Sequence, residues 1–449
     1  MSKVKTFPRG GVHPPEKKLT VDKPITTIPV PQKIWVPLSQ HIGAPASPVV
    51  QKGDAVLVGQ LLAEQKGFVS APVHSPVSGK ILKVDSVVGF TGYSQPAIQI
   101  QTEGDTWLDS IDRSDVLVSN IEGNGKELIK KIADAGIVGL GGAAFPTSVK
   151  LSVPAGKKID TLIINGVECE PYLTADHRMM LEHAREILVG VRVLMRALGV
   201  SKAYIGIENN KPDAIGLVQE TIANSGKISE GSISVVPLKT RYPQGAEKQL
   251  IKSILNREVP SGRLPLDVGT VVSNVGTAYA VYRAVQKNEP LVQRVITVTG
   301  TGVTRPGNYL ARVGTTVADL LEFAGGLPAD AGKVIAGGPM MGTAVGVLDA
   351  PVVKGTSGIL VLNQKESKRA PVTPCIRCGH CVSVCPMGLE PYLLELLVGA
   401  GKTEELDQHR ILDCIECGSC AYACPAGRHL LDAIRVGKGM VMEMRRRNG

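Results

Sequence analysis

The sequence predicts a multidomain chain in which α/β and β layers precede a small helical domain. Three observations indicate this organisation. Strands and helices alternate through the middle of the chain, short strands punctuated by glycine lie on either side of that region, and eight of the nine cysteines fall in the last fifth. At 449 residues the chain is long enough for about three domains. The earlier part must therefore fold on hydrophobic cores of its own.

The composition argues against several classes of protein. A hydrophobic content of 43% with 4% aromatic residues and 50 glycines is typical of layered domains with many tight turns. No apolar run reaches the ~18 to 20 residues that span a bilayer, and no signal peptide is visible, so we expect a soluble or peripheral protein in a reducing cytosol. The net charge of +9 is scattered, with little aromatic interleaving, so we expect no nucleic-acid partner.

One basic patch is concentrated, at Arg445 to Arg447 with Lys438 nearby. Its simplest interpretation is the solvated end of a helix. The alternative is a contact with anionic lipid or with an acidic partner.

The first 115 residues are predicted as an arm followed by a β domain. Residues 1–30 are rich in proline, lysine and glycine and are typical of an extended arm. Residues 31–115 hold short strands joined by turns such as Gly53-Asp54 and Ser75-Pro76-Val77-Ser78-Gly79. These turns resemble those of the barrel-sandwich hybrid domains that carry biotinyl or lipoyl groups. Lys66, near the hairpin tip, lies in Gln-Lys-Gly instead of a carrier motif, so we expect an unmodified, structural domain.

Residues 116–290 have the pattern of an α/β domain. The expected strands and helices alternate, at 126–135, 160–165, 175–198, 203–208, 212–224 and 232–237. Such alternation predicts a parallel sheet with helical crossovers. Ligands gather at the carboxyl ends of parallel strands, where Asn165, Glu168 and Glu170 would lie. We interpret Cys169, between them, as a small buried thiol.

A glycine-rich loop, Gly139-Leu140-Gly141-Gly142-Ala143-Ala144-Phe145-Pro146, precedes the first of these strands. Three glycines in four residues expose backbone N–H groups at the approach to a helix. This arrangement suits the binding of a phosphate or pyrophosphate group.

The last domain, residues 363–449, carries the pattern C-x2-C-x2-C-x3-C-P twice, ending at Pro386 and at Pro425. In this bacterial two-cluster ferredoxin pattern the first three cysteines of a run bind one cubane, and the fourth binds the other. Zinc sites and disulfides do not need this spacing. We therefore expect two [4Fe–4S] clusters, one on Cys375, Cys378, Cys381 and Cys424 and one on Cys414, Cys417, Cys420 and Cys385.

Several segments of residues 116–290 resemble the NADH and flavin site of the 51 kDa-type subunit of respiratory complex I. They are the glycine-rich loop with Lys150, the run from Asn165 to Pro171, Tyr242-Pro243-Gln244-Gly245-Ala246-Glu247, and Ser273-Asn274-Val275-Gly276-Thr277. The resemblance implies a Rossmann-like domain that binds FMN and NAD(H). It assigns the FMN to Gly139, Gly141, Lys150, Asn165 and Asn274, and the NADH side to Gly142, Phe145, Glu170 and Glu247. Tyr242 would lie near the flavin, and Glu168 and Gly245 belong to the same cofactor-binding segments.

This sequence departs from the complex I pattern at three charged positions. Leu140 replaces the arginine between the first two glycines, Ala246 replaces the first glutamate of Gly-Glu-Glu, and Gly276 replaces the glutamate of Asn-Val-Glu-Thr. These losses of charge bear on the nucleotide contacts more than on the flavin contacts.

Residues 291–362 resemble the soluble-ligand-binding β-grasp (SLBB) domain, on Arg305-Pro306-Gly307 and Gly337-Gly338-Pro339 among others. We interpret this domain as a structural spacer. The order of parts, from arm and barrel-sandwich domain through flavin and SLBB domains to the two-cluster domain, is similar to that of the C subunits of Rnf-type electron-transport complexes.

That resemblance implies a peripheral subunit at the cytoplasmic face of the bacterial plasma membrane. It would exchange electrons between NAD(H), FMN and two [4Fe–4S] clusters, as the NADH dehydrogenase-type part of a ferredoxin:NAD+ oxidoreductase. Its partners would be the membrane and iron–sulfur subunits of the Rnf complex. Through them it would reach ferredoxin indirectly, and they would translocate Na+ or H+.

Two other functions are compatible with the motifs. A flavin and iron–sulfur cobalamin reductase shares both modules, but its chain starts at the glycine-rich loop. A non-catalytic electron-wire or assembly subunit would have a flavin pocket that binds nothing. The A subunit of the sodium-pumping quinone reductase shares the first domains but lacks the eight cysteines.

Overall fold

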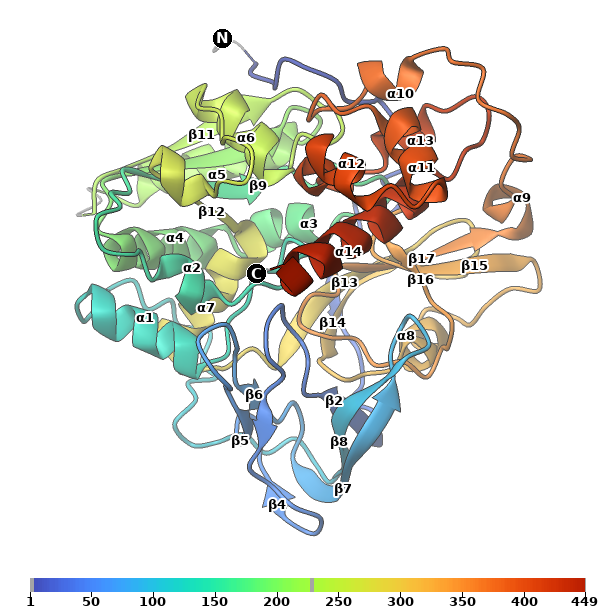
Figure 1. Ribbon diagram of the computed structural model, residues 1–449. Helices are drawn as coiled ribbons and strands as arrows, with labels where there is room; N and C mark the ends of the chain where they lie inside the picture. The colour runs from blue at the N-terminus through green and yellow to red at the C-terminus, as the bar shows by residue number, and fades with distance from the viewer. Residues whose placement is uncertain (1–3, 227–229, 449) are drawn as a thin grey trace.

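The computed structural model describes residues 4–226 and 230–448. Four folded parts, each with a hydrophobic core of its own, are joined by a long N-terminal arm. In Figure 1 a β domain (blue) lies at the bottom, an α/β domain (green) at the upper left, a second β domain (orange) at the right and a helical domain (red) at the upper right. The expected multidomain α/β and β architecture is confirmed.

The first β domain consists of two small antiparallel sheets around a core that includes Ile34, Leu62 and Ile98. One sheet has the order β2-β8-β7-β4 and the other β3-β5-β6. The strands are β2 (Lys33–Pro37), β3 (Ser47–Pro48), β4 (Ala55–Val56), β5 (Leu61–Glu64), β6 (Val73–His74), β7 (Gly79–Val88) and β8 (Ser94–Thr102). Gly79, at the start of β7, has a φ of +155° and lies so close to the Gln101 carbonyl that a Cβ would be 1.9 Å from its oxygen. The predicted Ser-Gly turn therefore requires glycine.

The α/β domain is built on four parallel strands in the order β11-β10-β9-β12. The strands are β9 (Thr161–Gly166), β10 (Lys202–Glu208), β11 (Ser232–Leu238) and β12 (Thr270–Asn274). The helices around them are α1 (Gly125–Asp134), α2 (Thr147–Leu151), α3 (Ala175–Glu182), α4 (Ala184–Leu198), α5 (Pro212–Asn224), α6 (Glu247–Leu255) and α7 (Val275–Lys287). The predicted parallel sheet with crossovers is confirmed.

The single helix expected over 175–198 is in fact two helices. His183, between α3 and α4, has φ −132° and ψ 31°, which lie outside the helical region. Its N–H still closes α3 on the Met179 carbonyl, and its carbonyl begins α4 by accepting from Ile187. The apolar periodicity continues across this break, so the sequence pattern did not reveal it.

The second β domain is a six-stranded sheet in the order β1-β14-β13-β17-β15-β16 with the helix α8 (Val317–Phe323). Its strands after the α/β domain are β13 (Gln293–Thr299), β14 (Gly307–Arg312), β15 (Ala331–Ala336), β16 (Thr343–Ala344) and β17 (Gly358–Asn363). The remaining strand, β1 (Ile25–Thr27), comes from the arm and pairs in parallel with β14. The arm is therefore extended, as expected, but its end is a strand of another domain.

The arm also crosses the α/β and helical domains before it reaches β1. Val12 pairs with Tyr242 through both backbone hydrogen bonds, and the Gly11 N–H donates to the Val384 carbonyl at 2.8 Å. Gly10 has a φ of +69°, and a Cβ there would lie 2.6 Å from the backbone carbon of Cys385. Only glycine allows the arm to approach the cysteine-rich domain this closely.

The helical domain contains short helices around the cysteines and a long final helix. They are α9 (Gln364–Ser367), α10 (His380–Ser383), α11 (Pro391–Gly399), α12 (Thr403–Gln408), α13 (Ser419–Tyr422) and α14 (Leu430–Asn448). Gly379 and Gly418 open α10 and α13 with the same φ of +74°, so the two cysteine runs fold alike. Within the described ranges no helix is long and apolar enough to cross a membrane.

The basic end of α14 is largely neutralised by neighbouring carboxylates. Arg445 pairs with Asp407 at 2.7 Å, and Arg446 and Arg447 both pair with Glu443. This arrangement agrees with the simpler interpretation, a solvated helix end.

Two glycines of the α/β domain provide a test of its helix packing. A Cβ on Gly190 of α4 would lie 1.8 Å from the Ala278 carbonyl oxygen of α7, whereas a Cβ on Gly216 of α5 would meet nothing within 4 Å. We expect Gly190→Ala to force α4 and α7 apart and to lower the free energy of unfolding by about 3 kcal/mol. Gly216→Ala should raise it by about 0.5–1 kcal/mol.

Apparent melting temperatures of the two purified variants, followed by circular dichroism, measure the difference. Equal melting temperatures for Gly190→Ala and the unchanged protein would contradict the close contact of α4 with α7.

Candidate functional site

The strand order of the α/β sheet has a switch point between β9 and β12. The chain runs from β9 to β10 and β11 on one side, and then returns to the other side of β9 as β12. We call the place at the carboxyl ends of these two strands the switch-point crevice, because the crossovers lead away from it in opposite directions. Ligands of open parallel sheets bind at such a switch point.

Asn165 and Asn274 face each other at this point, since they are directly paired in the register of β9 and β12. The Asn165 side-chain amide donates to the Gly245 carbonyl at 2.8 Å, which attaches the loop before α6 to the sheet. Asn274 caps α7, because its side-chain oxygen accepts from the N–H groups of Gly276 and Thr277. The N-terminus of a 13-residue helix thus lies beside the crevice, where its dipole favours an anion.

The glycine-rich loop passes over the Asn274 side of the crevice. A Cβ on Gly141 would lie 3.4 Å from the Asn274 Cβ, so the loop backbone and the strand end are in contact. The loop is closed by the Gly139 N–H, which donates to the carbonyl of the half-buried Phe145 at 2.8 Å. Gly141 and Gly142 are exposed, and a Cβ on Gly142 would meet nothing within 4 Å.

Lys150 of α2 provides a positive charge at the same edge. Its ammonium group donates to Glu247 Oε1 and to the Val272 carbonyl, each at 3.0 Å. Lys150 and Glu247 retain 33% and 39% of their side-chain exposure, so both remain accessible to a ligand.

The crevice therefore brings together four kinds of group: backbone N–H groups of the glycine-rich loop, the side-chain amides of Asn165 and Asn274, the ammonium group of Lys150, and the N-terminus of α7. These groups fit the phosphate and the polar ring edge of FMN, which needs donors at both ends. The predicted residues that the structure brings together here are Gly139, Gly141, Gly142, Lys150, Asn165, Gly245, Glu247 and Asn274. Their individual roles toward FMN and NAD(H) stay predictions.

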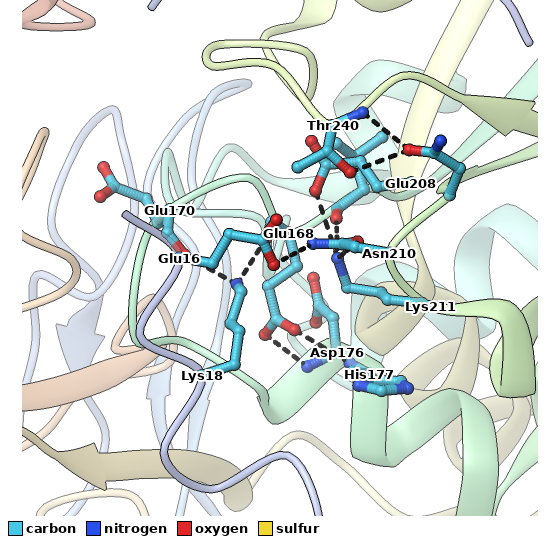
Figure 2. A network of polar contacts seen from close by, with 12 residues as sticks. Glu16, Lys18, Glu168, Glu170, Asp176, His177, Glu208, Asn210, Lys211 and Thr240 are labelled. Carbon is cyan, nitrogen blue, oxygen red and sulfur yellow. Dashed lines mark hydrogen bonds and ion pairs between the residues drawn. The ribbon is translucent and has the colours of Figure 1, made fainter. Parts of the chain in front are cut away.

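The loop that follows β9, residues 167–174, is held by two lysines that the sequence analysis did not identify, the half-buried Lys18 and the buried Lys211. Lys18 of the arm donates to the carbonyls of Glu168, Glu170 and Leu173 at 2.9, 2.9 and 2.7 Å. Lys211 donates to the Val167 carbonyl at 2.8 Å and to Glu208 at 3.2 Å. Figure 2 shows both ammonium groups approaching this loop. Burial lowers the pKa of Lys18, so its contacts with carbonyls replace a large part of its hydration.

Glu168 and Glu170 are both engaged in contacts with backbone N–H groups. The Glu168 carboxylate accepts from the N–H groups of Asp176 and His177 at the start of α3. The Glu170 carboxylate accepts from the N–H groups of Met340 and Met341, which belong to the second β domain, at 3.0 and 2.8 Å. Burial raises the pKa of Glu170 to about 7. In this structure both carboxylates hold backbone segments together.

Tyr242 connects the α/β domain to the cysteine-rich domain. It is 2% exposed, and its hydroxyl donates to the Cys417 carbonyl at 2.7 Å. Val12, Cys169 and Met340 pack in the same apolar cluster. Burial of its thiol raises the pKa of Cys169, although the residue as a whole is only half-buried, so the expected small buried thiol is confirmed in part.

Seven of the eight C-terminal cysteines gather in two groups. Cys385 lines one apolar hollow with Cys414, Cys417 and Cys420, although 29 residues or more of sequence separate it from them. Cys424 lies close enough to Cys381 for the charge of one to affect the pKa of the other, and so does Cys375. This crossed arrangement is the one that the two-cluster pattern predicts. The assignment of each cysteine to a cluster stays a prediction.

The two groups differ in exposure. The group around Cys417 is mostly buried, whereas Cys375 and Cys378 are exposed in a stretch in which all residues from 371 to 380 are exposed. The first group lies against the α/β domain through Tyr242, whereas the second has two exposed cysteines, Cys375 and Cys378, beside the buried Cys381 and the half-buried Cys424.

Four family models match the chain. The RnfC barrel sandwich hybrid domain matches residues 5–105, the Nuo51 FMN-binding domain residues 132–283, the SLBB domain residues 295–344 and the 4Fe-4S dicluster domain residues 374–428. The SLBB match covers most of the six-stranded sheet, and the dicluster match contains all eight cysteines.

Curated relatives match over nearly the whole length. The C subunit of the proton-translocating ferredoxin:NAD(+) oxidoreductase complex of Clostridium ljungdahlii is 48% identical, over 91% of this chain and 88% of the relative. The C subunit of the Na(+)-translocating ferredoxin:NAD(+) oxidoreductase complex of Acetobacterium woodii is 44% identical, over 98% of both chains. Among solved structures, an NAD+-reducing [NiFe]-hydrogenase in the air-oxidized state shares the fold with a TM-score of 0.52. That likeness, at 21% identity, covers 70% of this chain and 60% of the hydrogenase chain.

The neighbouring residues Lys17 and Lys18 provide a matched test of the loop after β9. We expect Lys18→Met to lower the free energy of unfolding by about 2–4 kcal/mol, because three part-buried carbonyls lose their donor. Lys17→Met removes an equal charge, an exposed ion pair with Glu366 and a cation–π contact with Tyr172, so it should cost only about 1 kcal/mol. Melting temperature and limited proteolysis between 166 and 174 measure the difference. Similar results for both variants would contradict the anchoring role of Lys18.

Proposed function

The chain belongs to the family of C subunits of ion-translocating ferredoxin:NAD(+) oxidoreductase complexes, and we propose that it carries electrons between NAD(H) and the other subunits of such a complex. In this proposal the chain is the NADH dehydrogenase-type subunit, and it works with FMN and two [4Fe–4S] clusters. The switch-point crevice is the observation that carries the proposal. Its hydrogen-bond donors suit FMN, and they lie in the domain that contacts the two-cluster domain.

FMN, when bound, exchanges electrons with NAD(H) in pairs and with iron–sulfur clusters singly. The residues of the crevice provide binding and orientation. The exposed amides of the glycine-rich loop, Lys150 and the N-terminus of α7 favour the phosphate, while Asn165 and Asn274 fix the two strand ends between which the ring would lie.

The cysteine groups suggest an order for the two clusters. The group of Cys385, Cys414, Cys417 and Cys420 touches the α/β domain through Tyr242, so we infer that it is the nearer to the flavin. The group of Cys375, Cys378, Cys381 and Cys424 lies at the exposed stretch 371–380 and would face the next protein of the complex.

The partners follow from the names of the relatives. We propose that the protein attaches peripherally to the cytoplasmic face of the plasma membrane and meets the membrane and iron–sulfur subunits of the same complex. Those subunits would connect it indirectly to ferredoxin and would translocate Na+ or H+. The cobalamin-reductase alternative is not retained, since the relatives match 91–98% of the chain.

An anaerobic preparation of the full chain tests the proposal. We expect about eight iron atoms and one FMN per chain, and bleaching of the cluster absorption when NADH is added. Lys150→Met should keep the iron but lose most of the FMN, because the ammonium group at the phosphate end is removed. Lys126→Met, an exposed change at the first turn of α1, is the control and should keep both.

Eight iron atoms without flavin, and no bleaching even after FMN is added back, would contradict the proposal. The chain would then act as an electron wire or assembly subunit.

The cluster ligands can be tested by pairs of substitutions. Because the fourth cysteine of each run crosses to the other group, Cys378→Ala and Cys424→Ala should abolish the same electron paramagnetic resonance signal, and Cys385→Ala and Cys414→Ala the other. Cys169→Ala, the ninth cysteine, should leave both signals intact. If Cys385→Ala instead removed the signal lost in Cys378→Ala, the crossed assignment would be wrong.

A further inference from the structure

The second β domain contacts the glycine-rich loop from behind through two buried cations. Arg294 of β13 donates to the Leu140 carbonyl and to the Lys354 carbonyl, both at 2.8 Å. Lys354, which precedes β17, donates in turn to the Gly136 carbonyl at 2.7 Å and to the Pro72 carbonyl at 2.8 Å. Arg294 and Lys354 are 7% and 1% exposed. Three domains therefore meet at these two side chains.

Arg294 and the α/β domain fix Leu140 from opposite sides. The Leu140 N–H donates to Thr277 Oγ1 of α7 at 2.9 Å, and the Leu140 carbonyl accepts from Arg294. A trans peptide is planar, so its carbonyl and the following N–H point in opposite directions. The N–H of Gly141 consequently points away from Arg294, from an exposed residue beside Asn274.

The charge of Arg294 also acts on the other wall of the crevice. Arg294 and Asp176 line the same cavity, which separates α3 and α7 from the second β domain. The Asp176 carboxylate accepts from the Asn274 side-chain amide at 2.6 Å. Burial raises the pKa of Asp176 to about 7, and the nearby guanidinium group opposes that shift. Arg294 thus favours the ionised form of Asp176, the residue that accepts the hydrogen bond from Asn274.

A cation is not needed to fill the space at this position. Burying a guanidinium group is costly, and the Arg294 Nε has no hydrogen-bond partner among the described residues. The cavity beside it is lined in part by apolar residues such as Met179 and Val295, against which an apolar side chain would pack without that cost. An apolar residue would provide neither the positive charge nor the two N–H donors that Arg294 directs at the Leu140 and Lys354 carbonyls.

We propose that Arg294 is a positioning residue through which the second β domain sets the flavin site, by orienting the peptide between Leu140 and Gly141 and by supporting the Asp176–Asn274 pair. The proposal rests on the assignment of FMN to the crevice. It gives the SLBB domain a part in cofactor binding, in place of the spacer role that we expected from the sequence.

Arg312 provides a matched control. It lies on β14 of the same sheet, is 9% exposed, and also joins two domains, through the Pro76 carbonyl and a two-pronged contact with Asp105. Its contacts reach the first β domain and not the glycine-rich loop. Arg312→Met therefore reproduces the loss of a buried interdomain arginine without touching the crevice.

Three full-chain variants, Arg294→Met, Arg294→Lys and Arg312→Met, test the proposal. We expect Arg294→Met to weaken FMN binding at least about tenfold and to shift the FMN midpoint potential, with iron content unchanged, because a charge-assisted contact and an orientation are lost together. Arg294→Lys keeps the positive charge but not the forked pair of N–H donors. Its FMN affinity should therefore lie between those of the unchanged protein and Arg294→Met. Arg312→Met should lower the melting temperature at least as much as Arg294→Met, yet keep FMN affinity within about twofold.

Hydrogen exchange of the peptide covering residues 137–145, measured without added FMN, separates this proposal from the assignment of FMN. Faster exchange there in Arg294→Met than in Arg312→Met is expected whether or not flavin binds. If the unchanged protein bound no FMN, the proposed function would fail. If Arg294→Met left both exchange and FMN affinity unchanged, or if Arg312→Met altered them equally, Arg294 would be only structural and the proposal would be overturned.

Discussion

The carboxyl end of the parallel sheet depends on cations that bind backbone carbonyls. A ligand crevice needs irregular loops, and loops that are buried leave carbonyl groups without partners unless another group donates to them. Here the donors are Lys18 from the arm, Lys211 from the sheet's own domain, and Arg294 with Lys354 from the second β domain. Each comes from a different segment, so the loops acquire their shape only when the whole chain has folded.

The same contacts place the cysteine-rich domain. The arm that delivers Lys18 to the loop after β9 also passes Gly10 and Gly11 against Val384 and Cys385. The second β domain, which receives the Glu170 carboxylate at Met340 and Met341, also places the Met340 carbonyl against Gly418. Electrons pass between centres only while the centres stay close. Here the arm and the Met340 segment independently hold the α/β domain against the cysteine group that contains Cys385 and Cys417.

Local signals in the sequence were enough to predict some of this structure and not the rest. Two runs of cysteines carry their spacing within 12 residues each, and β9 contains the apolar run Leu162-Ile163-Ile164 directly before Asn165 and Gly166. The break at His183 and the pairing of β1 with β14 have no comparable local signal, because tertiary contacts decide them. A signal did exist for Arg294 and Lys354, since each is a lone cation within an apolar run; only the three-dimensional structure identifies the carbonyls that they bind.

The departures from the complex I pattern are coupled in space. Leu140 and Gly276 lie 136 positions apart in sequence, yet a Cβ on Gly276 would be 3.7 Å both from the Leu140 side chain and from the Asp176 carboxylate. The arginine and the glutamate that the complex I pattern has at positions 140 and 276 would therefore be neighbours. Replacing both removes an ion pair and leaves neither charge without its partner. The cavity that Leu140 and Gly276 help to line also contains Arg294 and Asp176. Opposite charges thus remain beside the crevice, supplied by other elements, and the two departures are compatible with a site that still binds FMN.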